Sequence, residues 1–561
     1  MLASDRQDGR ILKGSVRSER AQMKQSLTSS RHFVAVGDRI VHCRRWGEGP
    51  VVLAVHGSPQ SSRAVAGVAE VLAGRGLCVI APDTPGAGLS TPLSMGAPET
   101  GDFARALLAF ADALGLGRFG VYGFHTGACT ACALATLAPE RVAAAALEGL
   151  PVWTEQERAD FLANYLPPFA PSWDGAHMAW LWARMEEQVL FFPWSDPTPR
   201  SRLAYDLSPL DRLHANAMDL LQSGDGYRAV YRAAFTFRAE DWLSPAGAPR
   251  LLMATRDDVL AAHLGRLTAG RNETLVRDSV AELHAAAADY LAKRPGDVSR
   301  AEPIQGDAGR GFSNGLTWRG TLAGPGRPLV LLHGWGDDHT RFDALWARLE
   351  GRRPVVAFDL SGHGASTPMT GDVVTTLAEA IGDLGLAAPA IVGEGTGGQI
   401  AAALADQGVA GPAATIGVEV HGPARRAAIA RHGAPALAPE WDGAHLVRAF
   451  RVARRERLFH PWFDATAAAA LAEPGSLEAA DVHRRAVRLL RAADALSPLN
   501  TWRLEHDLGG VARRLGERLT VFAQAGDPLS SPAQVAALGV PALPLPTAVS
   551  GWASALEAFA S

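Results

Sequence analysis

The residue with the clearest catalytic potential is His125, which lies between two glycines in the sequence Gly123-Phe124-His125-Thr126-Gly127. An unperturbed imidazole has a pKa of about 6.5, so it exchanges protons near neutral pH and is a suitable general base. Thr126 adds a hydroxyl directly after it. No carboxylate or second imidazole stands at a recognised ligand spacing from His125, so the sequence does not favour a metal site there.

A second candidate for chemistry is the C-x-x-C pattern of Cys129 and Cys132. Such a pair can indicate redox or metal-binding activity, but no second ligand pair and no redox-type strand context accompany it. Small thiols at positions i and i+3 are also common in helix packing, and this interpretation is favoured. Four cysteines among 561 residues give no disulfide framework.

The elements that must position His125 alternate between strands and helices. Residues 51–57 and 77–83 are apolar runs typical of buried strands, and residues 102–117 carry apolar side chains at helical spacing. Residues 119–128 are predicted to form a strand, a sharp turn and the start of a helix. This alternation predicts a parallel sheet that is covered by helices on both faces.

The whole pattern occurs twice along the chain. The pentapeptide Trp-Asp-Gly-Ala-His is present in both halves, and a Pro-Trp pair follows it each time. A repeat of this length indicates duplication of an entire domain. The matching residues lie 268 to 277 positions apart: His56 and His333, Asp83 and Asp359, Gly123 and Gly393, Trp173 and Trp441, and His177 and His445.

Three motifs of each half together resemble the α/β-hydrolase superfamily. They are HGSP and HGWG after the first long strand, DTPGAGLS and DLSGHGAS after the next, and a G-x-x-x-G elbow after the third. The resemblance implies a tandem pair of α/β-hydrolase folds, each a mostly parallel sheet flanked by helices. About 100 residues of helical pattern in each half stand where this superfamily inserts a helical cap.

This organisation predicts the domain boundaries. A polar segment rich in Gly and Pro is the expected linker, and the Ser- and Arg-rich N-terminus is the expected disordered tail, so that Met23 is an alternative start. The predicted parts are a tail at 1–30, a first domain at 31–292 with a cap at about 153–245, a linker at 293–312, and a degenerate second domain at 313–561 with a cap at about 422–512.

The superfamily's elbow carries a nucleophilic serine, and in this chain that position holds His125 in the first half and Gly395 in the second. By the same resemblance Asp257 or Asp258 stands where the catalytic acid is expected. No histidine stands at the turn after the last strand of either half, and His284 comes too late, five residues into the predicted terminal helix. Ordinary serine-hydrolase chemistry is therefore excluded. The resemblance assigns the oxyanion-binding N–H groups to Ser58 and Thr126.

The repeated pentapeptide has two interpretations. In one, His177 and Asp174 reach the elbow from the cap, and aromatic side chains wall a substrate pocket. In the other, Asp-Gly forms a turn and the tryptophans fasten the cap to the core. The motif is retained in the second half, where the elbow has no side chain, and this favours a structural or ligand-binding role. The candidate substrate-binding residues are Phe124, Trp173, Asp174 and Trp194.

Composition restricts the partners. The net charge is only −4 and basic residues are interspersed with acidic ones, so neither nucleic acid nor an anionic membrane is expected. The sequence has no run of about 18 apolar residues and no secretory apolar segment, which predicts a cytoplasmic protein. We expect a small-molecule ligand, no cofactor and a possible homo-oligomer, with the two halves imitating a dimer.

Two functions remain open. In the first, the protein is an enzyme in which His125 acts on a small, partly apolar carbonyl compound. The reaction is then ester or lactone hydrolysis, by fold analogy alone, or a cofactor-free proton abstraction of the lyase or isomerase type. In the second, the protein is a catalytically inactive relative that binds a small molecule or serves as a scaffold.

Overall fold

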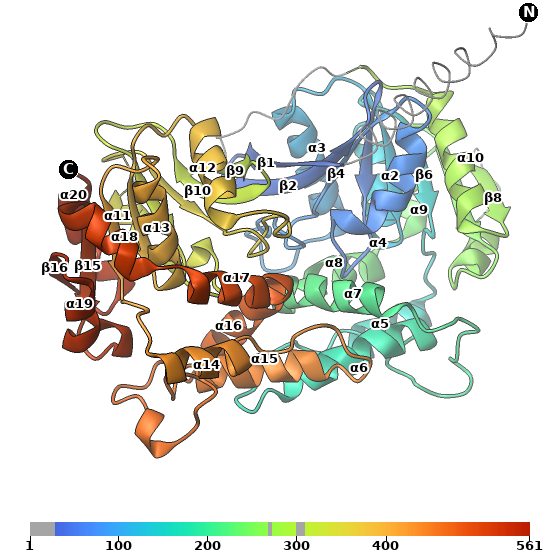
Figure 1. Cartoon of the computed structure of the whole chain (residues 1–561). Coiled ribbons are helices and arrows are strands. Elements are labelled where there is room, and N and C mark those ends of the chain that lie inside the picture. Colours follow the sequence, from blue (N-terminus) through green and yellow to red (C-terminus); the bar gives the residue numbers. More distant parts are fainter. Residues whose placement is uncertain (1–28, 268–271, 299–308, 350) are drawn as a thin grey trace, which may run out of the picture. The chain divides into compact units, whose positions relative to one another are not determined.

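The computed structural model of the chain describes residues 29–267, 272–298, 309–349 and 351–561 (Figure 1). The chain divides into two compact units. Besides residues 305–561, the second unit includes residues 170–186 and 208–218 of the first half, and the remaining residues belong to the first unit. Of the predicted tail, residues 1–28 lie outside the described residues, as do residues 299–308 of the predicted linker.

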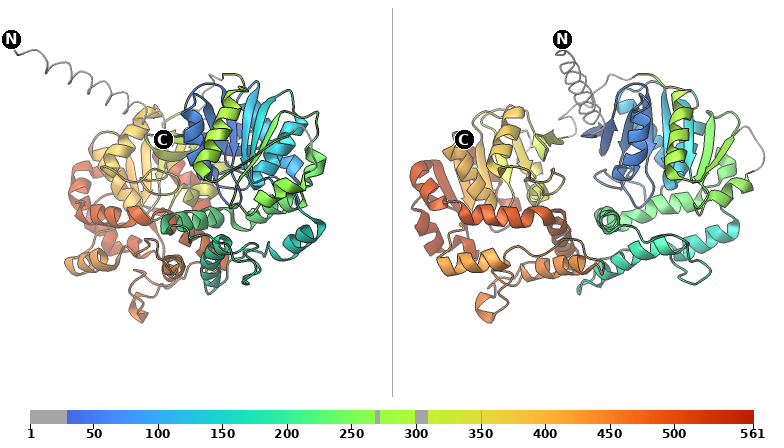
Figure 2. Two further views of the ribbon diagram at one scale, coloured as in Figure 1. Left: turned by 90° about the vertical axis from the view of Figure 1, so that its right-hand side faces the viewer. Right: turned by 45° about the vertical axis from the view of Figure 1, so that its right-hand side comes forward.

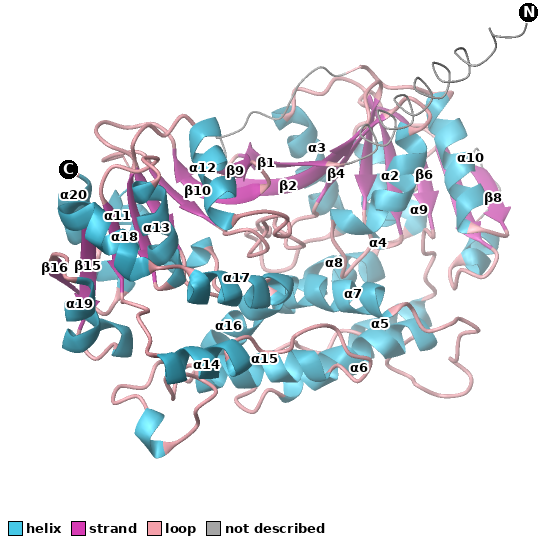
Figure 3. Ribbon diagram, viewed as in Figure 1, coloured by secondary structure: helices cyan, strands magenta, loops and turns pink. Residues whose placement is uncertain are grey.

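A mostly parallel sheet is the centre of the first unit (Figure 3). Among the described residues its order is β1-β2-β4-β3-β5-β6-β7-β8, antiparallel where β2 pairs with β1 and β4 and parallel from β4 onward. The strands are β1 (Ser30–Val36), β2 (Arg39–Trp46), β3 (Val51–Val55), β4 (Cys78–Pro82), β5 (Phe119–Phe124), β6 (Val142–Glu148), β7 (Arg250–Thr255) and β8 (Glu273–Arg277).

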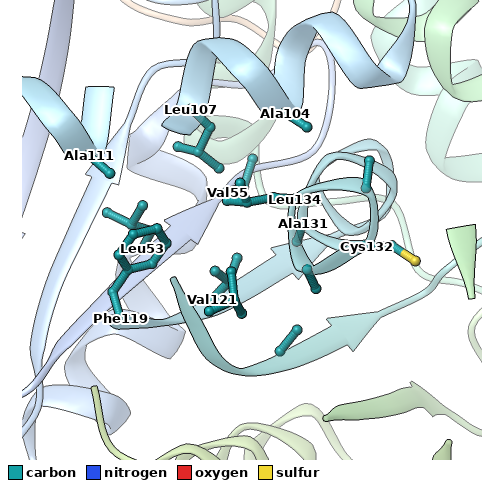
Figure 4. Packing of buried hydrophobic residues seen from close by; sticks show 14 of the residues in the cluster. Leu53, Val55, Ala104, Leu107, Ala111, Phe119, Val121, Ala131, Cys132 and Leu134 are labelled. Carbon is teal, nitrogen blue, oxygen red and sulfur yellow. The ribbon is translucent and has the colours of Figure 1, made fainter. Parts of the chain in front are cut away.

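Strand β3 shows why this sheet needs helices on both faces. All five of its residues are buried, and successive side chains of a strand point to opposite faces. Leu53 and Val55 join one apolar cluster with α3 and α4, part of which is drawn in Figure 4. Val52 and Ala54 join another cluster with α2 and α10, and the yellow-green α10 can be followed along the sheet in Figure 2. These helices are α2 (Ala66–Ala73), α3 (Thr100–Ala113), α4 (Thr126–Leu137) and α10 (Val280–Ala292).

A helical insertion separates β6 from β7, at the place predicted for a cap. Helices α6 and α7 begin within the residues that belong to the second compact unit and end within the first. The inserted helices are α5 (Glu155–Asn164), α6 (Ala176–Leu190), α7 (Leu210–Ser223), α8 (Tyr227–Thr236) and α9 (Ala239–Trp242).

The sheet of the second unit repeats the topology of the first. Over the described residues its order, β9-β10-β12-β11-β13-β14-β15-β16, matches that of the first sheet strand for strand. The predicted pair of mostly parallel sheets is therefore confirmed. The strands are β9 (Arg310–Ser313), β10 (Leu316–Thr321), β11 (Leu329–Leu332), β12 (Val355–Phe358), β13 (Ala390–Glu394), β14 (Ala413–Ile416), β15 (Leu519–Gln524) and β16 (Ala542–Leu545).

Two apolar clusters also enclose the second sheet. In β11, Val330 and Leu332 pack with α12, α13 and α18, whereas Leu329 and Leu331 pack with α20. Among the described residues, no helix combines the length and the hydropathy needed to cross a membrane. The helices are α11 (Trp346–Leu349), α12 (Val373–Asp383), α13 (Thr396–Asp406), α14 (Pro423–His432), α15 (Ala444–Arg455), α16 (Ala479–Arg491), α17 (Ala493–Glu505), α18 (Leu508–Leu515), α19 (Pro532–Leu538) and α20 (Ala553–Ala560).

The close packing of α4 on β3 makes a testable difference between two helical glycines. A Cβ on Gly127 would lie 2.3 Å from the carbonyl oxygen of Val55, whereas a Cβ on Gly67, at the same position of α2, would meet no atom within 4 Å. We expect Gly127→Ala to lower the free energy of unfolding by about 1–3 kcal/mol, as overpacking does. Gly67→Ala should raise it by up to about 1 kcal/mol through helix propensity. Urea unfolding measures both, and equal effects would contradict the packing described.

Candidate functional site

The site is organised by a sharp turn between β5 and α4. His125 occupies this turn with φ 49° and ψ −110°, a conformation that side chains other than glycine rarely adopt. Its backbone N–H donates to the carbonyl oxygen of Glu148 over 2.8 Å. A Cβ on Gly123 would lie 2.4 Å from the carbonyl oxygen of Gly127, so only glycine fits before the turn. The turn therefore raises one side chain, His125, above the end of the sheet.

His125 and Asp258 form an ion pair across the ends of β5 and β7. Nε2 of His125 lies 3.0 Å from Oδ2 of Asp258, and the two side chains are 34% and 10% exposed. The other carboxylate oxygen accepts the N–H of Leu260 over 2.8 Å, which fixes its orientation. The structure thus brings together two of the predicted residues, with the imidazole supplied by the elbow itself.

The pair changes the proton affinity of both partners. Burial on its own lowers the pKa of His125, but the hydrogen bond and the charge of Asp258 outweigh it and raise that pKa above 6.5. Burial on its own raises the pKa of Asp258, but the same interactions with His125 lower it below 3.8. When Nε2 donates to Asp258, the neutral ring keeps its lone pair on Nδ1. Nδ1 is thus the atom that can accept a proton.

A second carboxylate lies beneath the elbow, and sequence reasoning missed it. Glu148 at the end of β6 is buried and accepts a hydrogen bond from the hydroxyl of Tyr122 over 2.5 Å. Nε2 of His284 in α10 lies 3.4 Å from the same oxygen atom. Burial and the charge of Glu148 raise the pKa of Tyr122. The available signal was one acidic residue at the end of an otherwise apolar strand.

Ser58 and Thr126, the predicted oxyanion-binding residues, lie side by side. The backbone N–H of Ser58 donates to the hydroxyl oxygen of Thr126 over 2.9 Å, and that hydroxyl donates to Oγ of Ser58 over 3.1 Å. One expected donor is therefore occupied by a neighbouring side chain. A hydrogen bond two residues earlier helps to hold the loop that carries Ser58: Nε2 of His56 accepts the N–H of Thr84 over 2.9 Å.

Aromatic side chains from the helical insertion connect with this loop inside the first unit. The hydroxyl of Tyr231 donates to the carbonyl oxygen of Ser58 over 2.6 Å. Trp194, a predicted substrate-binding residue, lies 5.8 Å from Tyr165 between ring centroids. Phe124, also predicted, stacks on His125 at 4.0 Å. The ring contacts join Trp153, Phe161, Tyr165, Phe192, Trp194, Tyr231 and Phe235 into one cluster.

The remaining predicted site residues make contacts with residues other than His125 and Asp258. Asp257 uses its backbone carbonyl to accept a hydrogen bond from Tyr205. Trp173, Asp174 and His177 belong to the second compact unit. Trp173 is 69% exposed, Asp174 accepts the N–H of Ala176, and His177 hydrogen-bonds with a histidine of α16.

The second elbow repeats the turn without a side chain. Gly395 has φ 48° and ψ −110°, nearly identical to His125. The space beside it is taken by Glu419, because a Cβ on Gly395 would lie 3.2 Å from Oε1 of that residue. Glu419 accepts hydrogen bonds from Thr396 and Gln399 and pairs with Arg503 at 3.2 Å. A charged network therefore fills this elbow.

Nothing in the described ranges forms a group of three or more His, Cys, Asp or Glu side chains placed to hold a metal ion. Cys129 and Cys132 are buried free thiols within α4. Burial raises the pKa of both thiols, that of Cys132 to about 12, which keeps them protonated.

Both halves match known protein families. A family model described as alpha/beta hydrolase fold matches residues 50–261, and one described as alpha/beta hydrolase family matches residues 329–542. No curated protein matches the chain.

Many solved structures are similar to one half of the chain. Epoxide hydrolase A from Mycobacterium thermoresistibile is 20% identical, covers 48% of this chain and 100% of its own, and has a TM-score of 0.40. A variant of the epoxide hydrolase from Solanum tuberosum is 19% identical over 47% of this chain and 97% of its own, with a TM-score of 0.37. A bacterial membrane phospholipase A is 18% identical over 50% and 93%, with a TM-score of 0.36.

The ion pair predicts how His125 titrates. In the wild type, the pKa of His125 measured by NMR of the imidazole should lie above 6.5. Asp258→Asn removes the opposite charge and leaves burial in place, so we expect the pKa of His125 to fall below that of the wild type. Asp257→Asn, at the adjacent residue, is the control and should leave the titration unchanged. Identical titrations in all three proteins would show that the pair does not form.

Proposed function

Because the chain belongs to the α/β-hydrolase superfamily in both halves, we propose that its first half is an enzyme in which His125 is the general base. The substrate is a small, partly apolar carbonyl compound. The observation that carries this proposal is the 3.0 Å contact between Nε2 of His125 and Asp258. A histidine that only filled space at the elbow would not need a carboxylate within hydrogen-bonding distance of its imidazole.

The geometry suits proton abstraction better than nucleophilic attack. With Nε2 bonded to Asp258, Nδ1 of His125 takes a proton and Asp258 stabilises the imidazolium that forms. In hydrolysis the proton comes from a water molecule, whose oxygen attacks the carbonyl carbon of an ester or lactone. In a lyase or isomerase step it comes from a carbon next to the carbonyl group. Both reactions place negative charge on the carbonyl oxygen.

The oxyanion can be stabilised at the start of α4. Two donors aimed at the developing charge are the usual arrangement, and Ser58 and Thr126 are the residues that provide it by resemblance. In the structure the N–H of Ser58 is bonded to the hydroxyl of Thr126. Binding of a carbonyl oxygen would therefore replace that hydroxyl, which can rotate away about a single side-chain bond.

The proposed substrate class rests on the aromatic side chains that contact the loop carrying Ser58. The hydrogen bond from Tyr231 to the Ser58 loop attaches an aromatic cluster to the edge of the elbow. Aromatic rings favour apolar groups, and few polar atoms are needed to orient a small ligand. A compact substrate with one carbonyl group and an apolar body meets both conditions.

A second candidate function is ligand binding without catalysis. It is favoured by one observation, the occupation of the Ser58 N–H by Thr126, which leaves one oxyanion donor engaged. The two functions differ in what His125 contributes. A binding protein should retain its affinity for a carbonyl ligand in His125→Ala, whereas an enzyme should lose turnover.

Turnover on a panel of activated esters and lactones tests the proposal. For any accepted substrate we expect His125→Ala to lower turnover by roughly 10² to 10⁴, the range for loss of a general base. The matched variant is Gly395→Ala, which changes the equivalent elbow residue of the second half and should leave turnover nearly unchanged. Unimpaired His125→Ala would exclude the mechanism, and loss confined to Gly395→Ala would place the activity in the second half.

The pH profile gives an independent signature. Only the deprotonated base is active, so the rate should rise with pH and reach half of its plateau at the raised pKa of His125, above 6.5. Asp258→Asn should move this midpoint to lower pH while lowering the plateau. A midpoint below 6.5 in the wild type would contradict the role of the ion pair.

Serine-directed phosphonate probes provide a further check. No hydroxyl occupies either elbow position, since these are His125 and Gly395. We therefore expect no phosphonate adduct at either turn, as mapped by mass spectrometry of the treated protein. An adduct on Thr126 or Thr396 would mean that the turn presents a nucleophile one residue later.

A further inference from the structure

The two copies of the pentapeptide fold in the same way within the second unit. Asp174 and Asp442 each accept the N–H of the residue two positions later, at 3.1 and 3.0 Å. The next residues, Gly175 and Gly443, have φ of +84° and +69°, which favours glycine. The motif therefore forms a turn at the start of α6 and again at the start of α15.

Each turn packs on an aromatic ring from the helix that follows the other copy. A Cβ on Gly175 would lie 2.6 Å from Phe450, and a Cβ on Gly443 would lie 2.4 Å from Trp182. Trp182 and Phe450 are equivalent positions of the repeat, 268 residues apart, as are the two glycines. The contact is thus reciprocal, because each copy supplies one glycine and one ring.

The histidines of the motif repeat this reciprocity. Nε2 of His177 lies 3.1 Å from Nδ1 of His483, and Nε2 of His445 lies 3.0 Å from Nδ1 of His214. The partners His214 and His483 are themselves 269 residues apart, in the equivalent helices α7 and α16. The ring centroids are 5.1 and 5.0 Å apart at interplanar angles of 55° and 50°.

The tautomers of the motif histidines are fixed alike. Nδ1 of His177 accepts the N–H of Ser172 over 3.1 Å, and Nδ1 of His445 accepts that of Glu440 over 3.2 Å. Since Nδ1 is an acceptor in both rings, Nε2 carries the hydrogen and donates a hydrogen bond to Nδ1 of the partner histidine. Donor, acceptor and direction therefore correspond in the two pairs.

We infer that this contact is an isologous interface held within one chain, so that the second half serves as a built-in partner subunit for the first. In an isologous interface, residue i of one copy contacts residue j of the other copy, and residue j of the first contacts residue i of the second. Two copies of one protein commonly pair through such an interface. The two glycine–ring contacts and two histidine pairs meet that condition. The inference does not depend on the proposed catalysis.

This role accounts for the uneven retention of motifs in the second half. Its elbow has no side chain, yet its pentapeptide is complete. Residues 170–186 and 208–218 of the first half belong to the compact unit that the second half forms. Residues that contact these segments have a structural reason to be retained even where no reaction takes place.

Cleavage of the folded chain tests the inference. A protease recognition sequence is inserted between Ala301 and Glu302, and the purified protein is then cut. We expect the two fragments to remain associated at micromolar concentration by size exclusion and analytical ultracentrifugation, with the circular dichroism of the uncut chain. Separation of folded wild-type fragments at that concentration would overturn the inference.

Glycine substitutions in the cut protein locate the interface. Gly443→Ala should raise the dissociation constant at least tenfold over Gly385→Ala, because both glycines have nearly the same φ, +69° and +68°, but only the first meets a ring. Gly175→Ala should do the same relative to Gly408→Ala, with φ of +84° and +78°. Equal effects of target and control, or an effect at only one of the two targets, would contradict an isologous contact.

Substitutions in the histidine pairs test the same interface without adding backbone strain, again through the dissociation constant of the cut protein. In the cut protein, His177→Ala and His483→Ala should together raise the dissociation constant no more than either one alone, because they break the same bond. His177→Ala combined with His214→Ala should show multiplying effects, because these residues belong to different pairs. Multiplying effects within a pair would show that the histidines act separately.

Discussion

The structure depends on one backbone constraint, the turn that joins the third parallel strand of each sheet to the following helix. His125 and Gly395 adopt the same left-handed geometry although one has a side chain and the other has none. Such a conformation is maintained for a residue other than glycine only when its surroundings enforce it. The small residues beside the turn do so, because they let α4 approach β3 closely enough to contact its carbonyl oxygens. The fold thus holds the position for a functional group independently of which group is there.

Electrostatics then distinguish the two halves. In the first, a carboxylate at the end of β7 meets the elbow imidazole and raises its pKa, which leaves a titratable group facing the site. In the second, Glu419 lies against the turn and is satisfied by Thr396, Gln399 and Arg503. A carboxylate that is already paired offers little to a ligand. Two copies of one framework therefore hold a histidine–aspartate ion pair at one elbow and a glutamate-centred hydrogen-bond network at the other.

The sequence predicted the architecture well because its signals are local and repeated. Apolar runs, glycine-flanked turns and offsets of similar length indicate the strand–helix alternation and the duplication without knowledge of distant contacts. The site was harder to predict. His125 and Asp258 could be named from their motifs, but their 3.0 Å contact joins residues 133 positions apart. Glu148, Tyr122 and Tyr231 act through buried contacts that no short motif encodes, and the partners of His177 and His445 lie far along the chain.

The histidine pairs also set an acid limit for the second unit. Burial is the main cause that lowers the pKa of His177, His445 and His483 to about 4, against about 6.5 in an unfolded chain. The unfolded state therefore binds more protons than the folded one between these values, so the unit loses stability as the pH falls from about 6.5 toward 4. A contact between neutral imidazoles therefore responds to protons: it stabilises the second unit at neutral pH and loses that effect as the solution becomes acidic.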